Sequence, residues 1–115
     1  MTDDSRFDDR PLAMLRRVGK EALATKMIDL FLASAPQRAT TIEEGLAGGD
    51  LVGAGRAAHS LKPSAGQLGA VRLQNVCQSI EDAAKDGDAA AAGALLPDLR
   101  AELALAIHWL SSPRA

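Results

Sequence analysis

Two similar boundaries, Gly48-Gly49-Asp50 and Asp86-Gly87-Asp88, constrain the fold of this chain most strongly. Glycine can end a helix in the left-handed conformation, and an aspartate that follows can accept a hydrogen bond from the first free amides of the next helix. Apolar residues recur with helical spacing on both sides of each boundary. Each boundary therefore predicts a short connection between two antiparallel helices.

The apolar spacing predicts four substantial helices and one short one. Apolar positions repeat every three or four residues over 51–68, 73–84 and 92–110, and we expect Pro97 to bend the first turns of the last helix. A long helix over residues 20–47 is expected to kink at Pro36, because proline lacks an amide donor and crowds the preceding turn. Pro11 and Gly19 suit the start and end of a short covering helix.

Composition supports a single all-α domain. Alanine and leucine dominate the 115 residues, tyrosine is absent, and the residues that favour strands are scarce. We therefore predict an antiparallel up-down four-helix bundle with a short extra N-terminal helix, formed by residues 11–112. Residues 1–10, which contain four aspartates, are predicted to be a flexible tail.

Charge and cysteine content exclude several classes of function. Thirteen basic and 15 acidic residues give a net charge of -2, which argues against a nucleic-acid partner, and no apolar run is long enough to span a membrane. The single cysteine, Cys77, lies on a core stripe and indicates a cytoplasmic setting. His108 is expected at the surface, no metal site is expected, and no phosphate-cradling glycine loop is present.

One histidine lies away from the core stripe of its helix. At 100° per residue, His59 is roughly 130° from the centre of the stripe over residues 51–68, so we expect it to face solvent. Its neighbours on that face are small or compact, and two cations flank it three residues away on either side: Val52, Gly55, Pro63 and Gly66, with Arg56 and Lys62.

The residues around His59 suggest that this histidine has a chemical role. Gly55 costs about 1 kcal/mol relative to alanine inside a helix, and Pro63 about 3 kcal/mol, so a compensating role is expected. A low profile would let another protein approach the imidazole closely, while Arg56 and Lys62 neutralise a bound anion. That combination suits a histidine that accepts a phosphoryl group. An ordinary solvated histidine between solubilising charges is the alternative that spacing alone leaves open.

Residues 57–70, which spell AAHSLKPSAGQLGA, resemble the motif of histidine-containing phosphotransfer (HPt) domains in multistep two-component phosphorelays. The resemblance implies that His59 is the phosphoacceptor through Nε2 and that Lys62 holds the phosphoryl oxygens. It gives minor roles near the site to Ser64 and Gln67, and Glu81 is expected to orient a side chain there. It also implies a monomeric carrier rather than an autonomous kinase, with response-regulator receivers and a hybrid histidine kinase as partners and Mg²⁺ supplied by the receiver.

The sequence departs from this family motif at Pro63, where the family usually has glycine. Proline removes the amide donor to the carbonyl of His59, so docking geometry or partner choice could change. The first interpretation is a relay intermediate that shuttles phosphoryl groups through His59. The alternative is a non-catalytic adaptor that binds a receiver or kinase without accepting phosphate. A histidine-kinase dimerisation bundle is weaker, because the chain closes its own four-helix core and carries no ATP-binding domain.

Overall fold

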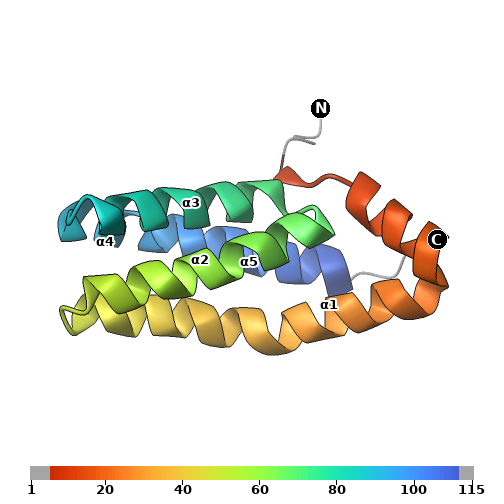
Figure 1. Ribbon diagram of the computed structural model, residues 1–115, viewed down its shortest axis with the longest axis horizontal. Helices are drawn as coiled ribbons and strands as arrows, with labels where there is room; N and C mark the ends of the chain where they lie inside the picture. The colour runs from red at the N-terminus through yellow and green to blue at the C-terminus, as the bar shows by residue number, and fades with distance from the viewer. Residues whose placement is uncertain (1–5, 112–115) are drawn as a thin grey trace.

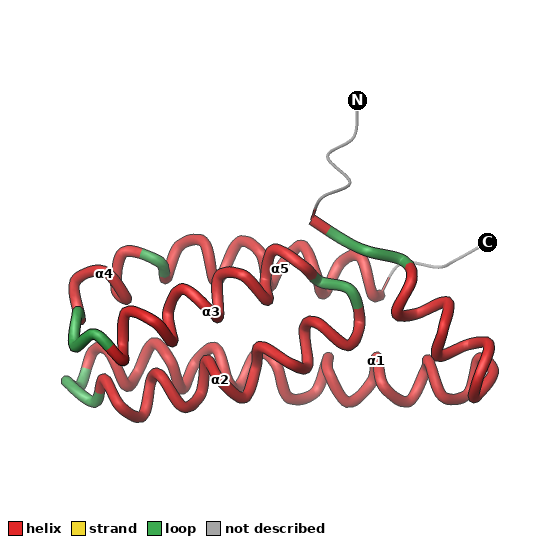
Figure 2. The backbone as a smooth tube through the Cα atoms, turned by 45° about the horizontal axis from the view of Figure 1, so that its top comes forward, coloured by secondary structure: helices red, strands yellow, loops and turns green. Residues whose placement is uncertain are grey.

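The computed structural model describes residues 6–111, which form five helices (Figure 1). These are α1 (Arg10–Ala47), α2 (Leu51–Leu68), α3 (Val71–Lys85), α4 (Ala89–Ala94) and α5 (Leu96–Ser111). The long helices lie side by side in an antiparallel bundle, and Figure 2 shows no strand in the described part of the chain. The predicted all-α bundle is confirmed.

The turns at the two predicted boundaries have the expected chemistry. The Asp50 carboxylate accepts a hydrogen bond of 2.9 Å from the Gly53 amide at the start of α2. Asp88 accepts one of 2.9 Å from the Ala91 amide at the start of α4. Gly49 and Gly87 have φ angles of 79° and 71°, a conformation that residues with a Cβ adopt reluctantly. These turns reverse the chain between neighbouring helices.

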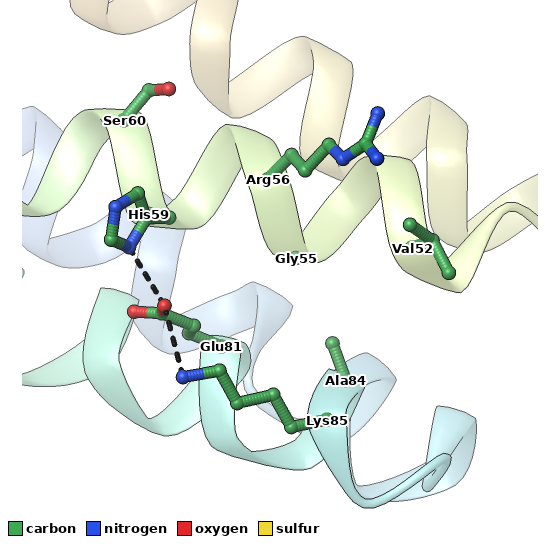
Figure 3. Close-up of a pocket in the computed structure, with 8 residues that line it drawn as sticks. All are labelled: Val52, Gly55, Arg56, His59, Ser60, Glu81, Ala84 and Lys85. Carbon is green, nitrogen blue, oxygen red and sulfur yellow. Dashed lines mark hydrogen bonds and ion pairs between the residues drawn. The ribbon is translucent and has the colours of Figure 1, made fainter.

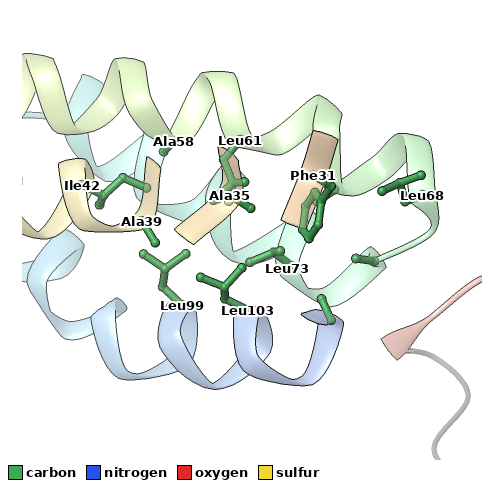
Figure 4. Close-up of a cluster of buried hydrophobic side chains, with 14 of the residues drawn as sticks. Phe31, Ala35, Ala39, Ile42, Ala58, Leu61, Leu68, Leu73, Leu99 and Leu103 are labelled. Atoms are coloured by element: carbon green, nitrogen blue, oxygen red, sulfur yellow. The ribbon is translucent and has the colours of Figure 1, made fainter. Parts of the chain in front are cut away.

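A single apolar core runs along the inside of the bundle (Figure 4). α1 contributes Phe31 and Ile42, and these large side chains alternate with buried alanines that let the helices approach closely. The other helices complete the core with Leu61, Leu68, Leu73, Ile80, Leu99 and Leu103. Cys77 is fully buried in the same cluster, as predicted. Burial of these side chains stabilises the scaffold that carries α2 and α3.

The first helix changes direction sharply at Lys20 (Figure 1). Lys20 has φ 60° and ψ −169° and separates a short N-terminal piece from the long piece that runs to Ala47. The predicted short covering helix is therefore present. Within α1, Lys20 is the one residue with non-helical backbone angles, so the marked break lies there, whereas Pro36 continues the helix.

Part of the predicted N-terminal tail packs against the bundle. The Phe7 ring stacks on Trp109 with centroids 4.4 Å apart, and the Asp8 amide donates to the carbonyl of Gly69 at 2.8 Å. Arg6 pairs with Glu102 on α5 at 2.8 Å. The expectation of a solvated tail was wrong for residues 6–8, because these long-range contacts offset their polar local sequence. Residues 1–5 of that tail, and residue 112 at the predicted domain end, lie outside the described residues.

The last helical stretch is divided where proline suggested a bend. α4 ends at Ala94 and α5 begins at Leu96, so the break falls just before Pro97, which suits the first turn of a helix. Among residues 6–111, no helix is both long enough and apolar enough to cross a bilayer.

Candidate functional site

His59 projects from α2 into solvent beside α3, and 65% of its side chain is exposed. Its Nδ1 lies 2.7 Å from Oε2 of Glu81, one of the dashed contacts in Figure 3. The exposure predicted from helical periodicity is confirmed. The sequence expectation that Glu81 points back toward this region is also met, since the carboxylate reaches the imidazole itself.

Glu81 is a buried carboxylate at the centre of a charged cluster between α2 and α3. Its side chain is only 8% exposed, and Oε1 accepts a hydrogen bond of 2.7 Å from the Lys62 ammonium. Lys85, one turn further along α3, lies 3.4 Å from Oε2. The bond from Lys62, aided by His59, lowers the pKa of Glu81 to about 2, although burial opposes this shift. Glu81 is therefore ionised at neutral pH.

The ionised carboxylate determines which imidazole nitrogen carries the proton. A carboxylate can only accept hydrogen bonds, so the 2.7 Å contact requires Nδ1 of His59 to be the donor. In the neutral ring Nε2 is then unprotonated and has a free lone pair. Figure 3 shows that this second nitrogen points away from Glu81. The geometry thus presents an exposed nucleophilic nitrogen with a fixed tautomer.

Lys62 lies closer to α3 than the sequence suggested. Its side chain is 22% exposed, and besides Glu81 it donates a hydrogen bond of 2.9 Å to Oε1 of Gln78. The amide of Gln78 in turn donates to Asp82 at 2.8 Å. Lys62 was expected to stand with Arg56 as a solvent-facing cation. Its position reflects the two acceptors that α3 places opposite it.

A hollow of about 470 Å³ opens beside His59, on the N-terminal side along α2 (Figure 3). Besides His59 and Glu81, its lining comprises Val52, Gly55, Arg56, Ser60, Ala84 and Lys85. Val52 is a large apolar residue that is nevertheless 65% exposed. The predicted grouping of Val52, Gly55 and Arg56 around His59 is therefore observed, and α3 supplies the opposite wall.

The expected role of Gly55 in leaving an open surface needs correction. Gly55 is buried, and a Cβ at this position would lie 2.8 Å from the Cβ of Ala84. A Cβ on Gly66 would similarly lie 2.5 Å from the side chain of Gln74. Both glycines face α3, so their small size allows α2 and α3 to pack closely. That packing brings Glu81 within reach of His59.

Pro63 lies exposed on the turn of α2 after His59, and the helix continues unbroken to Leu68. Proline has no N–H, so the helix supplies no amide donor at this position to the carbonyl of His59. The imidazole still reaches Glu81. Proline in place of the glycine that is usual in the family motif therefore leaves the contact between His59 and Glu81 in place.

Ser64 and Gln67 are not part of the His59 cluster. They line a separate hollow of about 310 Å³ between α1 and α2, where Arg38 donates to the Ser64 hydroxyl at 3.3 Å. His108 is exposed near the end of α5. Burial raises the pKa of Cys77 to about 12, so this thiol is a poor nucleophile. Residues 6–111 contain no group of three histidine, cysteine or acidic side chains suited to a metal ion.

Sequence reasoning missed Gln78 and Lys85, which surround Glu81 on α3. They lie three residues before and four residues after Glu81, and such spacings place side chains on one helix face. That pattern was visible in the sequence. Contact with Lys62, however, depends on how α2 and α3 pack, and periodicity within either helix does not give their relative register.

The fold and site together define a class of protein: a helical bundle that presents one oriented, exposed histidine at its surface. The family model described as "Hpt domain" matches residues 26–109. The chain belongs to this family and is a histidine phosphotransfer domain.

Individual relatives agree with this assignment. The crystal structure of histidine-containing phosphotransfer protein B (HptB) from Pseudomonas aeruginosa PAO1 superposes with a TM-score of 0.86 at 30% identity, covering 91% of this chain and 90% of that one. The signal transduction histidine-protein kinase BarA of Shigella flexneri is 35% identical over 79 residues, and that of Escherichia coli K12 is 34% identical. These matches cover 69% of this chain but only 9% of each kinase.

Proposed function

We propose that this domain is a phosphorelay intermediate in which Nε2 of His59 takes a phosphoryl group from an aspartyl phosphate and passes it to a second aspartate. The observation that carries the proposal is the 2.7 Å contact between His59 Nδ1 and the ionised Glu81. It leaves Nε2 unprotonated on a side chain that is 65% exposed. A reactive nitrogen at the surface suits exchange with a separate protein.

In the forward step the lone pair of Nε2 attacks phosphorus in line with the bond to the aspartyl oxygen. The N–P bond forms, the P–O bond breaks, and the electron pair leaves with the aspartate carboxylate. The proton stays on Nδ1 throughout and is donated in the hydrogen bond to Glu81, whose negative charge stabilises the positive charge that develops on the ring. The reverse reaction returns the phosphoryl group to an aspartate, so the same histidine can accept and donate phosphoryl groups.

The partner in this proposal is a receiver domain with an acidic, metal-bearing pocket. We assign Mg²⁺ to that receiver and no cofactor to this chain, which acts as a carrier and takes its phosphoryl groups ultimately from a hybrid histidine kinase. Exposed Val52 offers an apolar contact, and Arg56 and Lys85 offer positive charge to an acidic rim. We also propose that the domain is a monomer and that it works in the cytoplasm. The free, buried Cys77 is consistent with that reducing compartment.

Pro63 favours a second candidate, an adaptor that binds a receiver without accepting phosphate. Its ring lies on the turn next to His59, where it alters the surface that a partner meets. The intact contact between His59 and Glu81 supports the relay in preference to the adaptor, because an adaptor has no need of a fixed imidazole tautomer.

The test mixes the domain with phosphorylated receiver domains and Mg²⁺, followed by intact-mass spectrometry at neutral to alkaline pH. We expect an acid-labile adduct of one phosphoryl group on the wild type and none on His59→Gln. The surface variant His108→Gln serves as the matched control and should accept phosphate like the wild type. Receivers that bind the domain but leave no adduct would instead establish the adaptor.

A further inference from the structure

Lys62 donates hydrogen bonds to the charged Glu81 and to the neutral Gln78, and the relay mechanism described above gives Gln78 no role. Its ammonium donates to Glu81 Oε1 at 2.7 Å and to Gln78 Oε1 at 2.9 Å. Both acceptors come from α3, whereas Lys62 comes from α2. An ammonium has three donors, so at least one N–H remains for a further acceptor.

The orientation of the Gln78 amide is fixed by a third residue on α3. Its Nε2 donates to Asp82 Oδ1 at 2.8 Å, which turns Oε1 toward Lys62. Gln78 and Asp82 are four residues apart, a spacing at which helix side chains meet. The side chain of Lys62 is 22% exposed, while that of Lys85 is 70% exposed. Lys62 is thus the more constrained of the two cations around Glu81.

The neutral charge of Gln78 matters for a site that receives an anion. A carboxylate at this position would place a second negative charge beside Lys62 and oppose an incoming phosphoryl group. A glutamine accepts the same hydrogen bond and leaves the lysine charge uncompensated by this residue. The pair of acceptors therefore fixes the ammonium and adds one negative charge, that of Glu81.

We propose that Gln78 is a positioning residue for phosphotransfer, which holds the Lys62 ammonium so that its remaining N–H donates to the phosphoryl group on His59. Gln78 acts through Lys62 and does not itself contact the reacting atoms. This inference rests on the proposed function, because it requires His59 to carry the phosphoryl group. Asp82 supports the same arrangement indirectly, because it accepts the hydrogen bond that orients the Gln78 amide.

The test charges the intact domain with a small phosphoryl donor, phosphoramidate, and follows charging and phosphohistidine hydrolysis by intact mass. Without Gln78, the Lys62 ammonium should lose its charge-assisted hydrogen bond to the phosphoryl group. Gln78→Leu should therefore shorten the phosphohistidine lifetime by about tenfold. Gln78→Glu should slow charging by more than Gln78→Leu does, because it adds repulsion. Gln37→Leu, an exposed glutamine on α1, is the matched control and should leave both rates unchanged.

A double-mutant cycle with Lys62→Met separates positioning from a structural role. If Gln78 acts through Lys62, then Gln78→Leu should add no further effect in the Lys62→Met background. Circular dichroism melts identify any variant that fails to fold. If Gln78→Leu fails to fold, the isosteric Gln78→Glu is compared with the wild type in its place. Wild-type rates in Gln78→Leu and Gln78→Glu, or additive effects with Lys62→Met, would overturn the inference. Failure of the wild type to accept phosphate from any donor would instead overturn the proposed function.

Discussion

Glu81 and Glu43 each form ion pairs with a neighbouring helix of this bundle, and their surroundings give these pairs different consequences. Glu81 on α3 is 8% exposed and meets His59 and Lys62 of α2. Glu43 on α1 meets Arg100 of α5, with side chains that are 32% and 42% exposed. Hydrogen bonding to the cation lowers the pKa of both carboxylates. Water screens the second pair, whereas burial leaves Glu81 dependent on its protein partners.

The comparison shows that a salt bridge acquires a functional consequence when its carboxylate is buried and shared. Glu43 contacts Arg100, which also reaches Thr40 at 3.2 Å. Glu81 divides its two oxygens between a cation and an imidazole, and so it connects the position of Lys62 with the tautomer of His59. An exposed pair can be lost with little effect on the rest of the molecule.

The largest expected difference between the two regions is in phosphoryl acceptance. Glu81→Gln removes the ionised acceptor that holds the Nδ1 proton, so the charging rate should fall by at least about tenfold. Glu43→Gln, the matched change in the exposed pair, should leave this rate unchanged. Timed charging with phosphoramidate, read by intact mass, compares them. Equal rates in the two variants would break the distinction drawn between the pairs.

A smaller difference is expected in the pH dependence of stability. The pKa of Glu81 is lowered from its ordinary 4.5 to about 2, so the folded state favours the carboxylate. Its contribution to stability is complete above about pH 5 and is lost as the pH falls toward 2. Urea unfolding between pH 6 and 2 should therefore show a shallower loss of stability for Glu81→Gln than for the wild type. Parallel curves would contradict the depressed pKa.

The smallest effect concerns the exposed pair. A double-mutant cycle of Arg100→Ala and Glu43→Ala should give a coupling free energy below about 1 kcal/mol, and 1 M NaCl should reduce it further. The corresponding cycle of Lys62→Met and Glu81→Gln should give a larger coupling that salt changes less. Urea titrations at both salt concentrations provide the values. An exposed pair that coupled more strongly than the buried one would reverse the order.

Much of the fold was predictable because its determinants are local. The glycine and aspartate at Gly49-Asp50 specify their turn through backbone conformation and a side-chain cap, and apolar spacing specifies the buried faces. The exposure of His59 followed from the same spacing. Residues 6–8 were assigned wrongly, because contacts such as Phe7 on Trp109 join distant parts of the sequence.

The site was only partly predictable for the same reason. The family motif singled out His59 and Lys62, and a role for Glu81 was expected. The close packing at Gly55, which sets the register between α2 and α3, could not be read from either helix alone. Without that register, the contact between Gln78 and Lys62 had no signal in the sequence beyond the position of Gln78 near Glu81.

The most direct test of the central claim is a long-range ¹H–¹⁵N spectrum of the domain labelled at histidine, recorded at neutral pH before and after phosphorylation. The structure predicts that the neutral His59 ring carries its proton on Nδ1 and that the phosphoryl group appears on Nε2 of the same ring. A proton on Nε2 in the uncharged domain, or a phosphoryl group on Nδ1 or on another residue, would contradict the account.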